Sequence, residues 1–308
     1  MRILIEYLIF PGFLFTAIAG LMCSWVDRKV TARIQYRVGP PWYQNFMDFT
    51  KLLIKEIIVP EGASRFLFLS APVFGLAAVT LVSTILWMAD IAPDKTFLGD
   101  LIVVIYLLTI PAISIIIGGF ASKNPISSIG ASREMKLVLS YELPFILAIF
   151  VPVIKAGGII TLGGIIAFQA QSKVMLAYPS CWIAFLVSII CMQAKLGLVP
   201  FDIAEAETEI IAGPFTEYSG APLGIFRLTK QMLLFVLPVF LIVMFAGGIS
   251  LQGLGILWGI LKLVGILVII IVIKNTNPRL KIDQAMKFFW GPMTILAIIA
   301  VVLASRGL

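Results

Sequence analysis

Long apolar stretches recur along this chain and constrain its fold more than any other feature. About eight stretches reach the roughly 20 residues that a membrane-crossing helix needs, at 3–25, 66–89, 99–121, 136–154, 177–197, 222–247, 254–273 and 287–305. No polar segment between them is long enough for a soluble domain, and the first stretch is too long for a cleaved signal peptide. The sequence therefore predicts an all-α integral membrane protein with a single transmembrane domain over residues 1–308.

The composition agrees with this fold class and excludes several kinds of site. Hydrophobic residues make up 60% of the chain and charged residues only 13%, against about 25% charged in a typical soluble domain. Histidine is absent, which removes the commonest metal ligand and general base. Cys23, Cys181 and Cys191 form no Cys-x-x-Cys pair, and we interpret them as small buried hydrophobic residues. We expect no catalytic residue, metal site or cofactor site in this chain.

Basic residues gather in alternate loops and predict an orientation. The net charge is +7, and most of the 23 lysines and arginines lie in or beside the loops near 26–65, 122–136, 195–230 and 274–287. Cytoplasmic loops of membrane proteins carry such an excess of positive charge. We therefore predict that these loops are cytoplasmic and that both termini lie outside, in a multi-pass protein of the cell membrane.

The first of these loops has a pattern of its own. Trp42, Phe46, Phe49, Leu53 and Ile57 follow each other at helical spacing, with polar residues between them. This pattern predicts an amphipathic helix over about 42–57 that lies in the plane of the membrane interface.

Two ionisable residues stand out inside predicted spans, where a charge is costly and often functional. Glu142 lies in the fourth span and Lys262 near the middle of the seventh. Each can serve in ion coupling, or can simply form a salt bridge that holds neighbouring helices together. Glu6, Asp90 and Asp100 lie near the outer ends of spans, where we expect them to snorkel toward the interface or to be solvated.

The densest cluster of charge is an acidic loop at about 198–221. Its acids are Asp202, Glu205, Glu207, Glu209 and Glu217. Asp202 with Glu205 three positions later is typical of a capped short helix, and Gly213–Pro214 would end that helix. On such a helix Glu205 and Glu209 would be neighbours.

A solvated acidic surface is the simplest interpretation of this loop, but the residues between the acids favour burial. They are Ile203, Ala204, Ala206, Ile210 and Ile211. Crowded carboxylates do not all ionise easily, so some pKa values should be raised toward neutrality. The acids could then handle protons, or they could form a structural network with Arg28, Arg33 and Arg37. The sequence leaves both possibilities open.

Several motifs carry a resemblance to a known family. They are the segment from Asp27 to Pro40, Ser140-Tyr141-Glu142, the segment from Pro200 to Gly220, and Arg279 with Asp283 and Gln284 before the last span. Together they resemble the H-subunit family of respiratory complex I and its relatives in membrane-bound nickel–iron (NiFe) hydrogenases. The resemblance covers the whole chain.

The resemblance implies a membrane anchor that couples a peripheral redox arm to proton or sodium pumping. The partners would be hydrogenase-like large and small subunits, an iron–sulfur subunit, antiporter-like membrane subunits and lipid, with the NiFe and iron–sulfur centres in those partners. The ion-coupling residues would be Glu142, Asp202, Glu205, Glu207, Glu209, Glu217 and Lys262. Arg28, Arg33, Arg37, Arg279 and Asp283 would dock the arm.

Two segments resemble the hydrogenase-type branch in particular, Ala131–Met135 and Ala204–Glu207. The short, bulky segment Pro41–Phe46 differs from the longer glycine-rich segment of quinone-reducing members. We therefore expect ferredoxin-linked hydrogen evolution, with a sulfur-reducing or a quinone-reducing complex as the alternatives. A stand-alone ion transporter is the alternative of another class, although the chain has no visible internal repeat.

Overall fold

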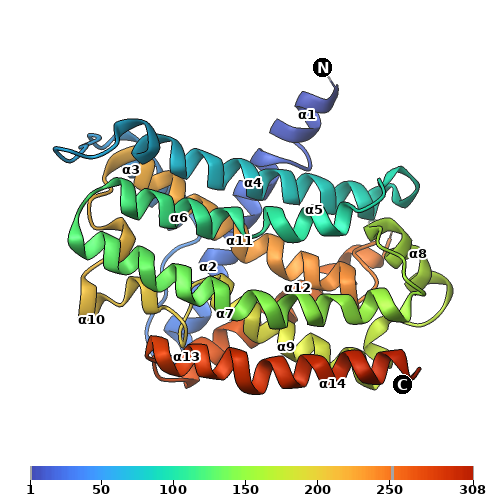
Figure 1. Cartoon of the computed structure of the whole chain (residues 1–308). Helices are drawn as coiled ribbons and strands as arrows, with labels where there is room; N and C mark the ends of the chain where they lie inside the picture. The colour runs from blue at the N-terminus through green and yellow to red at the C-terminus, as the bar shows by residue number, and fades with distance from the viewer. Residues whose placement is uncertain (1, 251–252, 308) are drawn as a thin grey trace.

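α-Helices form every long element of the chain, as the apolar stretches predict (Figure 1). The structure is a computed structural model that describes residues 2–250 and 253–307. The helices are α1 (Arg2–Leu8), α2 (Phe13–Ile34), α3 (Gln44–Ile54), α4 (Arg65–Ile91), α5 (Asp100–Leu107), α6 (Ile110–Ala121), α7 (Pro125–Lys155), α8 (Leu162–Gln171), α9 (Pro179–Lys195), α10 (Glu207–Ile210), α11 (Gly220–Phe245), α12 (Gly255–Thr276), α13 (Ile282–Phe288) and α14 (Thr294–Ser305). A π-helical turn, Phe289–Met293, joins α13 to α14.

The fold class is confirmed, and the number of spans needs a correction. In the described ranges, 7 helical segments are long and apolar enough to cross a membrane: Ile5–Ile34, Arg65–Ile91, Asp100–Ala121, Pro125–Lys155, Gly220–Phe245, Gly255–Thr276 and Ile282–Ser305. The span predicted at 177–197 forms α9, which is apolar but has only 17 residues. The predicted count of eight is therefore not confirmed.

Two helices are much longer than their apolar stretches. α2 continues to Ile34, beyond the predicted end near residue 25, and α7 begins at Pro125 instead of 136. The start of α7 has a local cause, because the Asn124 side chain accepts the N–H of Ile126 and a proline follows it. Hydropathy marks only the part of a helix that lies in hydrocarbon, so such polar extensions escape it.

Prolines within the predicted spans have two different effects. Pro72, Pro144 and Pro238 lie inside continuous helices, whose neighbours can satisfy the freed carbonyls. Pro11 lies between α1 and α2, and Pro111 is at the start of α6, just after the break that separates it from α5. The first and third spans are therefore each made of two helices.

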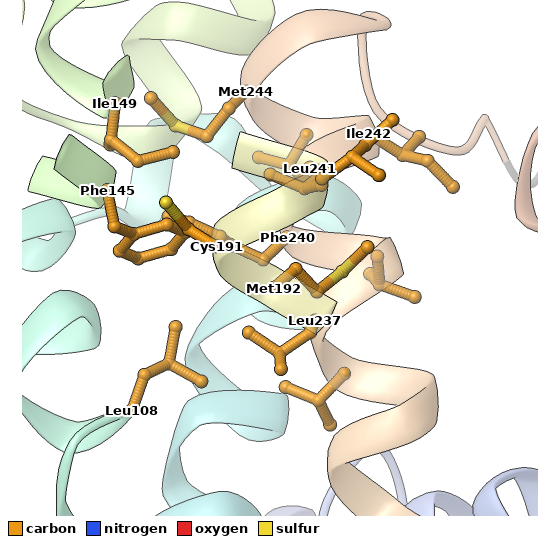
Figure 2. Packing of buried hydrophobic residues seen from close by; sticks show 14 of the residues in the cluster. Leu108, Phe145, Ile149, Cys191, Met192, Leu237, Phe240, Leu241, Ile242 and Met244 are labelled. Carbon is orange, nitrogen blue, oxygen red and sulfur yellow. The ribbon is translucent and has the colours of Figure 1, made fainter. Parts of the chain in front are cut away.

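α11 is the centre of the bundle, and it packs against α2 and α4 on one side. Figure 2 shows Leu237 and Phe240 of α11 among Phe145 of α7 and Cys191 and Met192 of α9. Cys23, Cys181 and Cys191 are all buried with free thiols, as the sequence analysis predicts. Because α7 also packs against α9 and α14, a charged group on α7 or α11 can face the interior of the bundle.

A helix forms in the predicted amphipathic segment, as α3 over Gln44–Ile54, while its position in the membrane interface stays a prediction. It packs on α11, where Phe49 and Leu52 contact Gly224. Asn45 is buried and donates to the backbone oxygen of Leu21 at 3.0 Å. Trp42 is 58% exposed, so the predicted apolar stripe is only partly covered by the chain itself.

Candidate functional site

The acidic loop joins α9 to α11 and does not form the capped helix that its spacing predicts. A 3-10 helix covers Ile203–Glu205, and no side-chain cap from Asp202 supports it. Ala206 has an extended ψ of 93°, and α10 begins only after it. Glu205 and Glu209 are therefore not neighbours on one helix, and each carboxylate is directed to its own partner.

Three loop acids form ion pairs with cations that come from three different elements. Asp202 pairs with Arg279, which follows α12, at 2.9 Å between Oδ2 and Nη2. Glu205 pairs with Lys230 of α11.

Glu209 makes the third pair, with Arg133 of α7, at 2.6 Å between Oε2 and Nη1. Since none of these partners is close in sequence, tertiary packing and not local helix geometry sets the positions of the acids.

The remaining two loop acids are Glu217 and Glu207, and the structure describes the side chain of Glu217 only. The Glu217 carboxylate accepts a hydrogen bond from the side-chain amide of Asn124, the residue that caps α7. The side chain of Glu207 lies outside the described residues, although its backbone belongs to α10. Glu217 therefore ties the end of the loop to the start of α7.

Small residues hold the loop against α7. A Cβ at Gly130 would lie 2.6 Å from the Cδ of Pro214, so the close approach requires glycine. Ser127 donates to the backbone oxygen of Pro214 at 3.0 Å. At the other end of the loop, the backbone N–H of Leu280 donates to the oxygen of Pro200 at 3.0 Å.

The apolar residues of the loop mostly favour burial, as predicted. Ile203, Ala204, Ala206 and Ile210 are buried. Ile211 is the exception, since it is 61% exposed and has a positive φ of 60°, an uncommon conformation for a β-branched residue.

A further ion pair lies deeper in the bundle. Lys195, the last residue of α9, donates to the carboxylate of Glu142 on α7 at 3.0 Å. The side chain of Lys195 is only 1% exposed, and its ammonium also lies 5.4 Å from the ring centre of Tyr141 and 5.0 Å from that of Phe145. Glu142 is thus paired across two helices in a mostly aromatic environment.

Glu134 and Lys230 connect this inner pair with the loop. Glu134 lies two turns before Tyr141 on α7 and is buried. Glu134 interacts electrostatically with Lys230 and with Tyr141. Lys230 also interacts electrostatically with Asp202, and Tyr141 with Glu142. These ionisable groups therefore form a series from Asp202 to the pair of Glu142 and Lys195, in which Glu134 interacts with its neighbours electrostatically, through space.

The pKa of Asp202 departs from its ordinary value for a different reason than the sequence suggests. Burial raises this pKa, and the positive charges of Arg279 and Lys230 oppose the rise. The sequence predicts a raised pKa for some acids of the loop, and this is confirmed for Asp202. The rise is caused by burial and not by repulsion among the acids. One carboxylate oxygen, Oδ1, is buried and forms no hydrogen bond.

A cavity of about 330 Å³ opens between the loop and the residues that follow α12. Its charged lining residues are Arg133, Asp202, Glu209, Arg279, Lys281 and Asp283. Arg279 and Asp283, two of the predicted docking residues, therefore lie together at this cavity. The described residues contain no group of three or more His, Cys, Asp or Glu side chains placed to hold a metal ion.

In the part of the chain that the structure describes, Arg28 pairs with α3 and not with the acidic loop, so the structural network, one of the two possibilities that the sequence left open, is not confirmed. Arg28 contacts Asp48 at 3.1 Å and Asn45 at 2.5 Å, both on α3. Arg33 and Arg37 are exposed at and just beyond the end of α2. The physical reason is the extension of α2, which carries Arg28 alongside α3.

Charged residues at the end of α11 farthest from the loop bond to backbone groups. Lys262 donates to the oxygens of Ala246 and Gly248, at 2.6 and 3.0 Å. Asp90 accepts the N–H of Ile249 at 3.0 Å, and Asp100, which is fully buried, accepts the N–H of Leu162 at 2.8 Å. The expectation is therefore wrong for Asp100, which is fully buried, whereas Asp90 is partly exposed; both carboxylates accept backbone N–H groups.

Comparison with known proteins identifies the family of the chain. The sequence pattern of the NADH dehydrogenase family matches residues 5–305. The chain belongs to the NADH dehydrogenase family. The H subunit of NADH-quinone oxidoreductase from Thermomicrobium roseum is 34% identical to it, over 97% of this chain and 94% of the relative. The corresponding protein from Syntrophotalea carbinolica is 33% identical, over 92% and 89%.

One solved structure of similar fold comes from the membrane-bound sulfane sulfur reductase, an archaeal respiratory membrane complex. The similar chain there has a TM-score of 0.89 and 29% identity, and the match covers 99% of this chain and 100% of that one. Membership of the NADH dehydrogenase family confirms the resemblance drawn from the acidic loop and the Ser140-Tyr141-Glu142 motif.

Sequence reasoning missed the partners of the acids in this member of the NADH dehydrogenase family. In the sequence analysis, Lys195 and Lys230 counted only among the basic residues that predict the orientation, and Glu134 only as part of the segment Ala131–Met135. The sequence could have indicated that Lys195 and Lys230 are paired, because each lies within an apolar stretch, where a charge needs a partner.

Proposed function

We propose that this chain is the membrane anchor and coupling subunit of an ion-translocating redox complex. A peripheral arm with nickel–iron-type and iron–sulfur centres docks at the acidic-loop end of the bundle. Electron transfer in that arm changes charge near the loop. The bundle passes this change to antiporter-like subunits that move H⁺ or Na⁺, while the chain itself supplies no redox centre.

The observation that carries the proposal is the series of ionisable groups that runs from the loop to the bundle interior. Asp202 and Glu205 lie at its outer part, Lys230 and Glu134 in the middle, and the pair of Glu142 and Lys195 inside. A charge that loses its partner in a low-dielectric interior costs several kcal/mol. A new charge at the loop therefore favours a new protonation or pairing state at the next group.

The same geometry supports a docking role for the loop end. The cavity beside Arg279 and Asp283 has charges of both signs, and Arg33 and Arg37 are exposed near the same membrane face. Mixed charges of this kind favour specific contacts with a complementary protein surface. In the proposal, Glu209 and Glu217 hold the loop in place beneath the arm through Arg133 and Asn124.

The terminal reaction belongs to the arm, and three candidates follow from different observations. Ala131–Met135 and Ala204–Glu207 favour a hydrogen-evolving complex. The structural similarity to a chain of the sulfane sulfur reductase favours reduction of a sulfur compound. Quinone reduction is the third candidate, because two relatives are named H subunits of NADH-quinone oxidoreductase.

The identity of the copurifying large subunit decides among these reactions. A large subunit with its four nickel-binding cysteines intact supports hydrogen evolution, and one that lacks some of them supports sulfur reduction or quinone reduction. Purification of the complex through a tag on this chain, followed by mass spectrometry, supplies that sequence.

Glu142→Gln in the whole complex tests the coupling role. We expect electron transfer from the arm to persist while ion movement into proteoliposomes falls at least tenfold. If both survive intact, the chain is a passive scaffold. Vesicles that hold this chain alone provide the control, because ion flux without partners would support the stand-alone transporter instead.

A further inference from the structure

The end of α11 farthest from the acidic loop is closed by a side chain from another helix. The ammonium of Lys262 on α12 donates to the backbone oxygens of Ala246, at 2.6 Å, and Gly248, at 3.0 Å. Gly247 and Gly248 have φ values of 78° and 73°, which lie in the left-handed region. Glycine permits this turn, and the turn presents both carbonyl groups to one point.

A carboxylate stands beside that point. Both oxygens of Asp90, near the end of α4, accept the N–H of Ile249, at 3.0 and 3.2 Å. Asp90 and Lys262 attract each other electrostatically. A Cβ on Gly248 would collide with Oδ1 of Asp90, so the turn lies directly against the carboxylate.

Carbonyl oxygens at the C-terminal end of a helix in a membrane protein are suited to bind a cation. Here two such oxygens meet at one half-buried point, and the Asp90 carboxylate lies against the same turn. We propose that this point is a binding site for a monovalent cation of the ammonium type, and that Lys262 supplies the cation permanently from within the chain. This inference does not depend on the proposed function.

The site has a consequence for α12. This helix packs against α2 and α11, and its remaining face is apolar and mostly exposed. In the first half of the helix that face includes Leu257, Trp258, Ile260, Leu261 and Val264. Lipid is as apolar as these side chains, so hydrophobic contact alone does not fix the rotation of the helix. Lys262 in the first half of the helix and the pair of Lys274 and Asp27, 2.8 Å apart, near its C-terminal end fix it.

Chemical rescue of Lys262→Ala in the full chain, in detergent micelles, tests the proposal. We expect the substitution to lower Tm by about 5 °C. Propylammonium chloride should restore at least half of that loss, while 1-propanol and choline chloride should not. Lys287→Ala, which removes an exposed lysine of α13, is the control and should show neither the loss nor the rescue. An unchanged Tm, or a loss that propylammonium does not reverse, would overturn the proposal.

Lys262→Gln separates a need for a cation from a need for any hydrogen-bond donor, and it avoids a large cavity. Its side-chain amide can still donate, but it has no charge. We expect it to lose at least half as much Tm as Lys262→Ala. A Lys262→Gln chain as stable as the native chain would mean that the carbonyl groups need only a neutral donor, and the cation site would be disproved.

Discussion

Charged side chains at the two ends of the bundle have partners of different kinds. At the acidic-loop end, Asp202, Glu205 and Glu209 pair with side chains from other elements. At the opposite end, Asp100 bonds to the backbone of Leu162 and Lys262 to that of Ala246 and Gly248. A side-chain pair can exchange partners or protons as its surroundings change, whereas a cap on a backbone group mainly holds structure. The functional acids of this chain are therefore expected at the loop end.

The largest effect should come from the buried pair at the inner end of the series. Lys195→Met leaves the Glu142 carboxylate without its cation between α7 and α9, and the free energy of unfolding should fall by about 3–5 kcal/mol. Denaturant unfolding of the full chain in micelles measures this. The double variant Lys195→Met/Glu142→Gln should recover at least half of the loss, since it removes the uncompensated charge. Additive losses would show that the two residues do not act as a pair.

Asp100→Ala tests whether the opposite end is purely structural. The substitution leaves the N–H of Leu162 without its acceptor, so the free energy of unfolding should fall by about 1–3 kcal/mol. Ion movement per electron transferred by the folded complex should stay unchanged. Asp94→Ala, at an exposed position nearby, is the control for stability. A specific loss of ion movement in Asp100→Ala would contradict the claim that charged residues at this end of the bundle are purely structural.

The pH dependence of stability should reveal the buried state of Asp202. Burial raises its pKa in the folded chain, so the folded chain holds this proton more tightly than the unfolded chain does. The stability from this group is present below the ordinary aspartate value of about 3.9 and is lost as pH rises through the raised value.

Thermal unfolding from pH 4 to pH 7 checks this expectation. The Tm of the native chain relative to that of Asp202→Asn should decrease as pH rises. Arg279→Gln removes a favourable positive charge and should extend the decrease to higher pH. A relative Tm that stays constant, or that increases with pH, contradicts a raised pKa at Asp202.

The smallest effect should come from the pair outside the series. Arg28 and Asp48 are 45% and 38% exposed, and such pairs contribute only about 0–1 kcal/mol. Asp48→Asn should therefore change the free energy of unfolding by less than about 1 kcal/mol, most at low salt. Denaturant unfolding at two salt concentrations measures it. A loss as large as that of Lys195→Met would mean that the α2–α3 contact belongs to the essential charges.

The sequence was sufficient to predict the positions of most spans, because hydropathy reports directly which residues can lie in lipid. It located α3 as well, since the spacing of Phe46 and Phe49 is helical. It did not locate the ends of α2 and α7, because Asp27 to Ile34 and Pro125 to Met135 continue the helices with polar residues.

The partners of the acids were beyond local sequence rules. The spacing of Asp202, Glu205 and Glu209 predicts one capped helix, yet tertiary partners on α7, α11 and the segment after α12 break it. These partners are distant in sequence, so no local pattern reveals them. The residues of the site could be predicted, but not the pairing between them.

The most direct test of the central claim is ion movement by the whole complex with Glu205, Glu207 and Glu209 all replaced by Gln. The complex is placed in proteoliposomes, and electron transfer and ion uptake are measured together. We predict that electron transfer by the arm persists while ions moved per electron fall at least tenfold. An unchanged ratio of ions to electrons would contradict the claim that the loop acids connect the arm to the membrane interior.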